Sequence, residues 1–460
     1  MSKPAAFEAG DLRAATKVPI RLFLLVVVAV GPLLHPYADQ QASRYALTGA
    51  IWDDHTIQLD DYASVLGRDA AFRAGHLYSD KAPLQPFIGV PFYATYRLVG
   101  GEPATVLRID RNLGLWWQTL WLAAVPLGLL AILMYLLAHR VNPATALPAA
   151  AAIAFGTILM PFGAVLFGHV LAGLLVLAAV LLVSSDDPRP RHLVSAGVCL
   201  GAAVAVEYTA GLAVLAISGF AVWRQWRSYF WIALGGLPFA ILLGLYHEVA
   251  FGSPLAHPYT YNIWWGFVEE QRGFFHDFVP LSFDHLVRIF VSGRGFLIAS
   301  PVVLLSVVGL ILLLRQRDMA LRRTGALALI LLLAFALIPL TWNNPWGGFS
   351  PGPRYMVPAL PVLALGAAAA WSRRPLLTTY AVVVSVATMV LATFTNPLVT
   401  PNGSGGLGTW LGLAADGEFV DSLFTMVMGD WGWLLHALLV ALVARSLHTA
   451  WQEQRAAMPG

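Results

Sequence analysis

The charged residues of this chain are concentrated in one stretch, His35 to Pro83, between two apolar segments. Charge is scarce elsewhere, since Asp, Glu, Lys and Arg make up only 12% of the 460 residues. Carboxylates can take a proton from a reacting group, and nearby cationic groups can stabilise a developing anion. The same charges also suit a loop that is merely solvated. The members are Asp39, Arg44, Asp53, Asp54, Asp60, Asp61, Arg68, Asp69, Arg73, Asp80 and Lys81.

Two features of this stretch favour a ligand site over a solvated loop. The segment Ser43 to Trp52 has the pattern of a short amphipathic helix suited to a membrane surface. The segment Gly75 to Leu84 carries Asp80 and Lys81 directly into the next apolar run, where an unpaired ion is costly. A charged pair at that depth usually has a partner or a ligand.

The elements that position these residues must lie in a membrane. Hydrophobic residues make up 58% of the chain, and its mean hydropathy is +0.69. Its long apolar runs lack the alternation of barrel strands, so they must satisfy their backbone hydrogen bonds as helices. We expect an all-α polytopic membrane protein with about twelve transmembrane helices and a large extracytoplasmic first loop containing short surface helices.

Basic residues in short connections give the expected orientation, because such residues face the cytoplasm. They occur at Arg189 and Arg191, Arg224 and Arg227, Arg315 to Arg323, Arg373 and Arg374, and Arg445 to Arg455. Both termini are then inside. The chain is expected to form a single membrane domain, 1–460, with a cytoplasmic N-terminus and first helix in 1–34. A catalytic outer loop in 35–83 and a helical bundle in 84–460 follow, with outer loops at about 252–294, 343–354 and 396–428.

Two segments do not fit as full crossings of the membrane. Leu84 to Val99 is short and contains Pro91 and Arg97, so we expect a partial or strongly tilted pass. Val194 to Trp223 has Glu207 in its middle, which splits it into two short halves.

The composition excludes several classes of partner and cofactor. A net charge of +3, with no basic and aromatic stripe and no zinc-binding spacing, argues against nucleic acid. The single cysteine, Cys199, allows neither an intramolecular disulfide nor a cysteine metal cluster. A divalent cation is chemically conceivable among Asp39, Asp69, Asp80 and His76, but no spacing specifies one, so the metal ligands stay unknown.

The order of motifs in the first loop resembles that of the C-type glycosyltransferases. Asp39 precedes Arg44-Tyr45-Ala46, and the loop closes on Tyr78-Ser79-Asp80-Lys81-Ala82-Pro83-Leu84. In the protein O-mannosyltransferase and aminoarabinose-transferase branch, an acidic residue precedes Arg-Tyr-Ala and the loop ends on Tyr-x-acidic-Lys-Pro-Pro-Leu. Here Asp39 lies two residues further from the arginine, and Ala82 replaces the first proline. The later stretch Gly352 to Pro361 resembles the Arg-Tyr and double-proline helix start of the same family.

This resemblance implies an enzyme that uses a polyprenyl-phosphate sugar donor. Its acceptor would be a lipid, a glycan or a protein, and the reaction a single displacement with inversion. The active site would face outward from a bacterial inner (plasma) membrane, among membrane lipids. By the resemblance, Asp39 is the first choice for the catalytic base, Asp69 is the rival, and Asp60 or Asp61 come third.

The candidates for binding the donor phosphate are cationic residues and the residues next to them. Lys81 can meet a lipid phosphate as a point charge, although Asp80 could also consume it as an ion pair. Arg354 follows a glycine-rich turn and can bind phosphate bidentately, or it can simply snorkel at a helix end. His169 stands where many members of the family have a second acidic residue, although a histidine on an apolar helix is more often a buried, hydrogen-bonded structural residue. The full set of substrate-binding candidates is Arg44, Tyr78, Asp80, Lys81, His169, Arg294 and Arg354.

An aromatic segment and a rival function complete the expectations. Tyr259 to Phe278 could stack on sugar rings or form an ordinary interface belt. The alternative function is a secondary transporter or lipid flippase, with Glu207, Glu248 and Arg97 along the path. Polar groups should converge near the outer surface in a transferase and near the midplane in a transporter.

Overall fold

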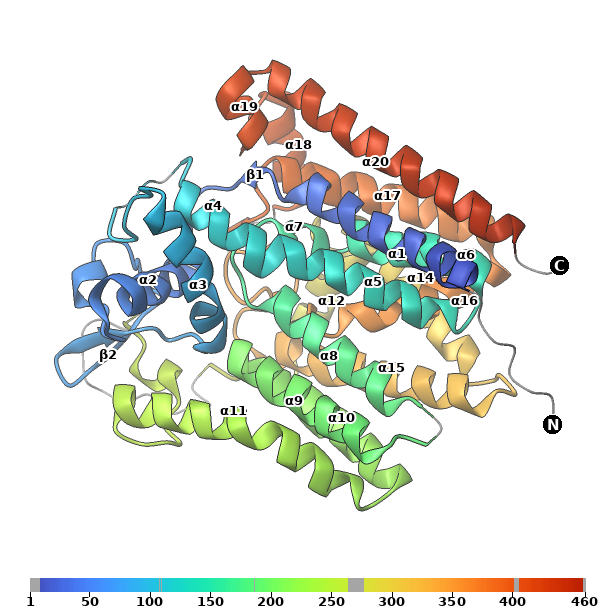
Figure 1. Cartoon of the computed structure of the whole chain (residues 1–460), viewed down its shortest axis with the longest axis horizontal. Coiled ribbons are helices and arrows are strands. Elements are labelled where there is room, and N and C mark those ends of the chain that lie inside the picture. Colours follow the sequence, from blue (N-terminus) through green and yellow to red (C-terminus); the bar gives the residue numbers. More distant parts are fainter. Residues whose placement is uncertain are drawn as a thin grey trace.

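The computed structural model describes residues 9–106, 108, 110–185, 187–263, 277–400 and 405–457. Helices run between two ends of the molecule (Figure 1). At the left of that view lie α2 (Asp39–Gly49), α3 (Leu84–Leu98) and β2 (Ala71–Arg73), and we call this the loop end. At the opposite end, α1 (Ala9–Val30) begins and α20 (Trp431–Ala456) finishes.

Contacts between distant parts of the sequence define this opposite end, which we call the basic end. Asn142 Nδ2 donates to Ser372 Oγ (3.0 Å), and Tyr135 lies within hydrogen-bond distance of Gln454 (3.0 Å). Arg224 Nη1 donates to the carbonyls of Val183 (3.0 Å) and Ser185 (2.8 Å). The short connections that carry the basic residues therefore meet at one end, as the positive-inside rule requires.

Among the described residues, five helices are long and apolar enough to cross a membrane. They are α4–α5 (Leu113–Thr119 and Val125–His139, joined by the π-turn η3, Leu120–Ala124), α11 (Ser228–Phe251), α15 (Met319–Thr341), α17 (Pro375–Phe394) and α20. A sixth span is bent by 89° between α12–α13 (Phe283–Val291 and Phe296–Ala299) and α14 (Pro301–Leu313). Shorter apolar helices are α6 (Pro143–Gly156), α8 (His169–Val183), α9 (Pro190–Val206) and α10 (Gly211–Arg224).

These helices, with α1 and α16 (Leu363–Arg373), alternate in direction between the two ends. The chain is therefore an integral multi-pass membrane protein, and the expected all-α fold of about twelve passes is confirmed. Two 3₁₀ turns, η7 (Arg354–Met356) and η8 (Leu360–Val362), precede α16, because Pro358 and Pro361 interrupt regular helix there.

The helix α3 does not traverse the bundle. At its start, Gln85 Nε2 donates to the carbonyls of Leu122, in the π-turn η3, and of Phe167, in the connection before α8 (both 3.2 Å). At its end, Arg97 Nε contacts Asp53 of the first loop (2.9 Å). Both ends of α3 thus stay with the loop end, in agreement with the partial pass expected from the sequence.

The helices α9 and α10 form a hairpin whose tip is Glu207. A 3₁₀ turn, η4 (Tyr208–Ala210), separates them, and α10 returns to the basic end, where Arg224 bonds to the end of α8. The segment Val194 to Trp223 is therefore two passes, and Glu207 lies where a carboxylate can meet polar partners.

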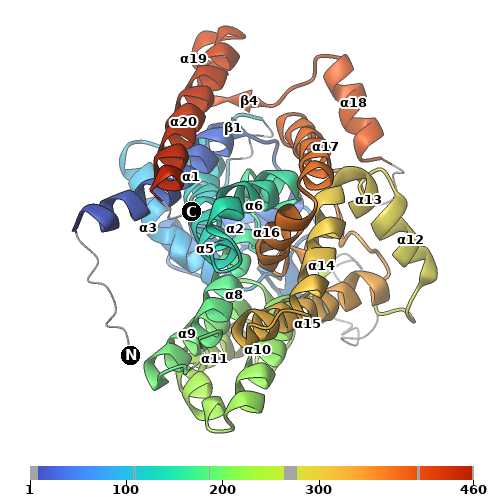
Figure 2. The ribbon, with the colours of Figure 1, turned by 90° about the vertical axis from the view of Figure 1, so that its right-hand side faces the viewer.

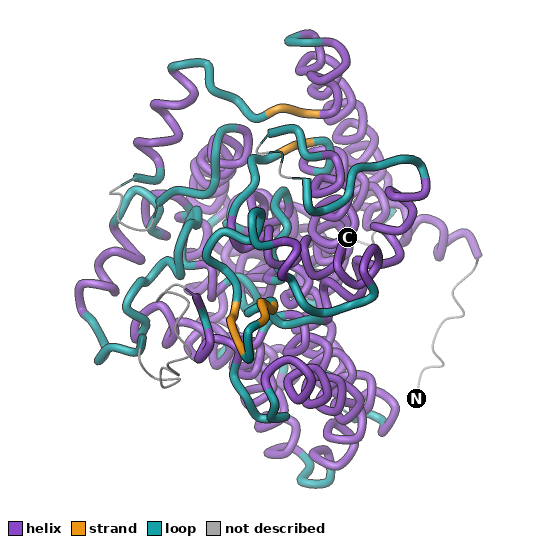
Figure 3. The backbone as a smooth tube through the Cα atoms, turned by 90° about the vertical axis from the view of Figure 1, so that its left-hand side faces the viewer, coloured by secondary structure: helices purple, strands orange, loops and turns teal. Residues whose placement is uncertain are grey.

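The first loop folds onto the bundle as a compact layer, seen face on in Figure 3. It contains α2, the π-turn η1 (Ala50–Asp54), the 3₁₀ turn η2 (Asp60–Tyr62), and a hairpin of β2 with β3 (His76–Tyr78). The register pairs Ala71 with Tyr78 and Arg73 with His76. A second strand pair joins β1 (Leu33–Leu34), which follows α1, to β4 (Asp421–Ser422). The strand β4 lies between α18 (Leu407–Ala415) and α19 (Leu423–Met428).

The helix α2 is more buried than a helix lying on a membrane surface. Every residue from Gln40 to Gly49 is buried. Its polar side chains face protein groups, since Gln41 accepts from the Leu166 N–H (3.0 Å) and Arg44 reaches the α9–α10 tip. An apolar cluster that includes Tyr45, Leu47 and Phe251 fixes the loop to α3 and α11. The layer can therefore hold charged groups in fixed positions.

Candidate active site

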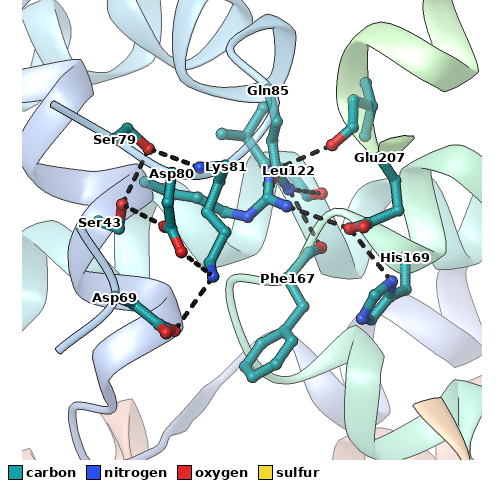
Figure 4. Close-up of polar contacts among 12 residues, drawn as sticks. Ser43, Asp69, Ser79, Asp80, Lys81, Gln85, Leu122, Phe167, His169 and Glu207 are labelled. Carbon is teal, nitrogen blue, oxygen red and sulfur yellow. Dashed lines mark hydrogen bonds and ion pairs between the residues drawn. The ribbon is translucent and has the colours of Figure 1, made fainter. Parts of the chain in front are cut away.

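A buried cluster of charged side chains surrounds Lys81 at the loop end (Figure 4). Lys81 Nζ lies 2.9 Å from Asp80 Oδ2 and 3.4 Å from Asp69 Oδ2, and its side chain is only 3% exposed. Asn262 Nδ2 donates to the same oxygen of Asp80 (2.7 Å). Behind Asp80, the hydroxyls of Ser43 and Ser79 are 2.8 Å apart. We call Asp39, Asp69, Asp80 and Lys81 the Lys81 cluster.

The charges in this cluster oppose the cost of burial. Burial raises the pKa of Asp80, while the Lys81 ammonium acts in the opposite direction. Burial alone would lower the pKa of Lys81, but the carboxylates of Asp69 and Asp80 raise it above its ordinary value. Lys81 is therefore held as a cation, and it is not consumed by Asp80 alone.

Asp39 joins the cluster at the N-terminal end of α2. Its carboxylate accepts a hydrogen bond from the Arg68 N–H and lies against Gly67, whose φ is +58°. Burial, and next the like charge of Asp69, raise the pKa of Asp39, with Arg68 and Lys81 acting against them. This makes Asp39 a stronger base than an exposed aspartate, as general-base catalysis requires.

Beside the Lys81 cluster, Glu207 connects Arg44 and His169. Arg44 Nη2 and His169 Nδ1 each lie 3.2 Å from Glu207 Oε2, and Arg44 Nη1 also donates to the Val206 carbonyl (3.3 Å). Three elements thus meet here, namely α2, the start of α8 and the tip of α9–α10. Glu207 was not among the predicted site residues. Its signal was a carboxylate in the middle of an apolar run, which the sequence analysis assigned to the transport alternative.

Arg354 supplies a second buried cation from η7. Its guanidinium lies over the rings of Phe167 (5.8 Å) and Tyr355 (5.4 Å). It rests against Gly347 and Gly348, whose φ values of 76° and 114° place them in the left-handed region. A side chain at either glycine would occupy the space of the guanidinium, so this turn requires glycine.

The environment of Arg354 differs from that of Lys81. Arg354 is near enough to Asp69, His169 and Glu207 for electrostatic interaction. However, among the described residues no carboxylate lies within 4.0 Å of its guanidinium, and its Nε is buried without a hydrogen-bond partner. A buried guanidinium that interacts with Tyr355 but has no close carboxylate is suited to receive an anion through its remaining donors.

Tyr259 and Asn262, from η5 (Pro258–Tyr261) and the residue after it, close the cluster from the side of α11. Lys81 Nζ lies 5.1 Å from the centre of the Tyr259 ring. The aromatic segment predicted from Tyr259 to Phe278 is described at its two ends, while 264–276 fall outside the described residues.

Other predicted residues have different surroundings. Tyr78 is buried edge-on against Phe251, with ring centres 5.7 Å apart. Arg294 donates to the carbonyls of Ser350 (3.0 Å), Val399 (3.3 Å) and Thr400 (2.9 Å), so it holds two loops together.

The third-ranked acids lie in the hairpin region of the loop. Asp60 Oδ2 is 2.6 Å from His76 Nδ1, and its other oxygen accepts from the Leu77 N–H (2.7 Å). Asp61 is exposed. In the part of the chain that the structure describes, no group of three or more His, Cys, Asp or Glu side chains is arranged to hold a metal ion.

The bundle and its folded first loop share their fold with solved structures of ArnT from Cupriavidus metallidurans. The structure of ArnT from Cupriavidus metallidurans bound to undecaprenyl phosphate matches with a TM-score of 0.51 and 14% identity, over 97% of this chain and 76% of that chain. The apo state of the same protein gives a TM-score of 0.50 and 15% identity, over 96% and 76%.

A more distant match is the archaeal oligosaccharyltransferase AglB from Archaeoglobus fulgidus, with a TM-score of 0.47 and 12% identity over 95% of this chain and 56% of that chain. No protein-family model and no curated protein sequence matches the chain.

Proposed function

We propose that this protein is a membrane glycosyltransferase that transfers a sugar from a polyprenyl-phosphate donor to an acceptor on the extracytoplasmic side of a bacterial inner membrane. The observation that carries the proposal is the meeting of a carboxylate of raised pKa, Asp39, with the buried cations Lys81 and Arg354. The shared fold with ArnT, whose structure contains undecaprenyl phosphate, supports it.

In the proposed reaction, the acceptor oxygen forms a bond to the anomeric carbon while the bond from that carbon to the phosphate oxygen breaks, with inversion. Asp39 takes the acceptor's hydroxyl proton. The leaving phosphate gains negative charge, which Lys81 and Arg354 stabilise. The longer of the two Lys81 contacts, at 3.4 Å to Asp69, is the one that a phosphate would replace.

The positions of the remaining charges favour this proposal over a transporter. Arg97 pairs with Asp53 of the folded first loop, and Glu248 is exposed on α11. Glu207 is held by Arg44 and His169 beside the Lys81 cluster. These charges do not line one path through the bundle, and the polar groups converge at the loop end, as expected for a transferase.

The test is incubation of the purified protein with a panel of polyprenyl-phosphate sugars, followed by measurement of donor hydrolysis and transfer. Wild type should consume at least one donor. The variant Asp39→Asn should keep donor binding but lose about 100- to 10,000-fold in rate, because the amide cannot accept a proton.

The matched control is Asp61→Asn, which changes an exposed carboxylate of the same loop and should leave the rate unchanged. If Asp39→Asn retains a rate within about threefold of wild type, the base is assigned to Asp69 instead. If wild type binds donors but turns none over, with any acceptor class, the proposal is wrong.

A further inference from the structure

A polar cavity lies at the basic end, far from the Lys81 cluster. It has a volume of about 530 Å³, within the usual range of small-molecule sites. Its walls come from the end of α8, the end of α10, the start of α11 and the start of α15. Figure 2 looks onto this end of the molecule and shows α9, α10, α11 and α15 grouped there.

Two polar atoms in the cavity wall have no hydrogen-bond partner among the described residues. Ser228 is only 1% exposed, and its hydroxyl makes no hydrogen bond. The Nε of Arg323 is also buried without a hydrogen-bond partner. Buried polar groups are normally satisfied, because leaving one unpaired costs free energy. Two such groups on one cavity therefore indicate a missing ligand.

The chemistry of the wall selects an anion. Arg224 and Arg323 bring guanidinium groups from α10 and α15, and Arg224 is fixed by bonds to the carbonyls of Val183 and Ser185. Ser228 is the first residue of the 24-residue helix α11, where the helix dipole favours negative charge. Asp187 also lines the cavity, but it is exposed. Guanidinium, hydroxyl and helix N-terminus together suit phosphate oxygens.

The position of the cavity along the membrane normal indicates that the phosphate belongs to a lipid. Trp223, Trp226 and Tyr229 flank it and are 72%, 64% and 54% exposed. Exposed tryptophan and tyrosine side chains at the ends of membrane helices mark the headgroup region of a bilayer. Basic pockets between helices on the cytoplasmic side are where anionic headgroups bind.

We propose that this cavity binds the headgroup phosphate of an anionic phospholipid in the leaflet at the basic end, through Arg323 and Ser228, while Arg224 adds positive charge to the cavity wall. The bound lipid bridges the α10–α11 connection and α15. It therefore braces the helix hairpin whose other end carries Glu207.

The test measures thermal stability of the full protein in neutral detergent as phosphatidylglycerol is added. Wild type should gain stability in a saturable manner, and uncharged diacylglycerol should have no such effect. Arg323→Gln should weaken the apparent affinity for phosphatidylglycerol about tenfold, because a charged hydrogen-bond donor is lost.

The matched control is Arg322→Gln, one residue away on the same helix. Arg322 is exposed, and among the described residues its side chain donates a hydrogen bond to Met319 Sδ (3.1 Å), so its change should leave the affinity unaltered. If Arg323→Gln does not fold, Ser228→Ala provides the second variant and should weaken the affinity by a smaller factor.

Three results would overturn the proposal. One is equal loss of affinity in Arg322→Gln and Arg323→Gln, which would mean general charge attraction. The second is full stabilisation by glycerol 3-phosphate or inorganic phosphate, which would make the ligand soluble. The third is the absence of any preference for phosphatidylglycerol over diacylglycerol in wild type.

Discussion

Lys81 and Arg354 are both buried cations, but their partners differ. Lys81 is paired with Asp80 and Asp69, whereas no carboxylate lies within 4.0 Å of Arg354 among the described residues. Removing Lys81 therefore leaves two buried carboxylates without their cation, which is strongly destabilising. Removing Arg354 takes away a charge that the free protein does not use in an ion pair. The two residues should respond differently to substitution even if both contact the donor phosphate.

We expect Arg354→Gln to weaken donor binding with little loss of thermal stability. Lys81→Met should weaken donor binding and also lower stability by about 3–5 kcal/mol. Lys81→Arg should restore only part of the binding, because the planar guanidinium differs in reach from an ammonium. The measurements are donor affinity and the melting temperature of each variant.

The matched control for these cations is Arg73→Gln, since Arg73 lies in the same loop over the ring of Tyr261 (5.4 Å). It should leave donor affinity unchanged. Donor affinity that is likewise unchanged in Arg354→Gln would refute the phosphate site at Arg354.

The pH dependence of the reaction follows from the environment of Asp39. Burial and the charge of Asp69 raise its pKa above the ordinary value of about 3.9. Because the base must be ionised, kcat/KM should fall on the acidic side at a higher pH than for an exposed aspartate. Asp69→Asn removes the like charge, so this acidic limb should move to lower pH. Loss of activity at all pH values in Asp69→Asn would instead identify Asp69 as the base.

At the scale of elements, the position of Asp39 depends on the turn at Gly67. Gly67 has a φ of +58°, and a methyl group added there would overlap the Asp39 carboxylate. Gly67→Ala should therefore displace Asp39 and reduce transfer by at least about tenfold.

A matched control separates this effect from backbone strain. Gly75 lies in the same loop with a φ of +85°, and an added methyl group would have no atom within 4 Å. Gly75→Ala should show a similar loss of stability, about 1–2 kcal/mol, with little loss of activity. Equal activities of the two variants would mean that the turn does not position Asp39.

The sequence predicted the individual helices and loops better than it predicted which of them contact one another. The sequence pointed to Lys81 and to the partial pass from Leu84, because a charge next to or within an apolar run is costly and therefore needs a reason. Glu207 gave the same signal, but only the fold shows that it ends a hairpin and meets Arg44 and His169. Such a long-range contact cannot be seen in one sequence, since Arg44 and Glu207 lie 163 positions apart.

Arg294 shows the reverse case, in which the sequence predicted a ligand-binding residue and the structure shows bonds to loop carbonyls. The sequence made Arg294 a substrate-binding candidate, because a guanidinium can bind phosphate. The structure gives it the carbonyls of Ser350, Val399 and Thr400, which belong to loops distant in the sequence. Loop carbonyls carry no distinctive sequence signal, so this structural task could not have been predicted.

At the scale of the whole molecule, the two ends differ in charge and in chemistry. The loop end holds the buried Lys81 cluster, and the basic end holds the connections rich in arginine and the proposed lipid site. Lys17 near the start of the chain lies 3.4 Å from Glu453 near its end, so both terminal helices reach the basic end. The positive-inside rule then predicts that the basic end faces the cytoplasm.

This orientation predicts the outcome of cysteine labelling in a Cys199→Ser background. Ser64→Cys, in the first loop, and Arg317→Cys, in the connection before α15, both place a thiol at an exposed position. In intact cells a thiol reagent that cannot cross the membrane should label Ser64→Cys and leave Arg317→Cys unlabelled. Inverted membrane vesicles should give the reverse pattern, because they expose the cytoplasmic face. Labelling of Ser64→Cys only from the cytoplasmic side would place Asp39, Lys81 and Arg354 on the wrong surface, and an extracytoplasmic transferase would be excluded.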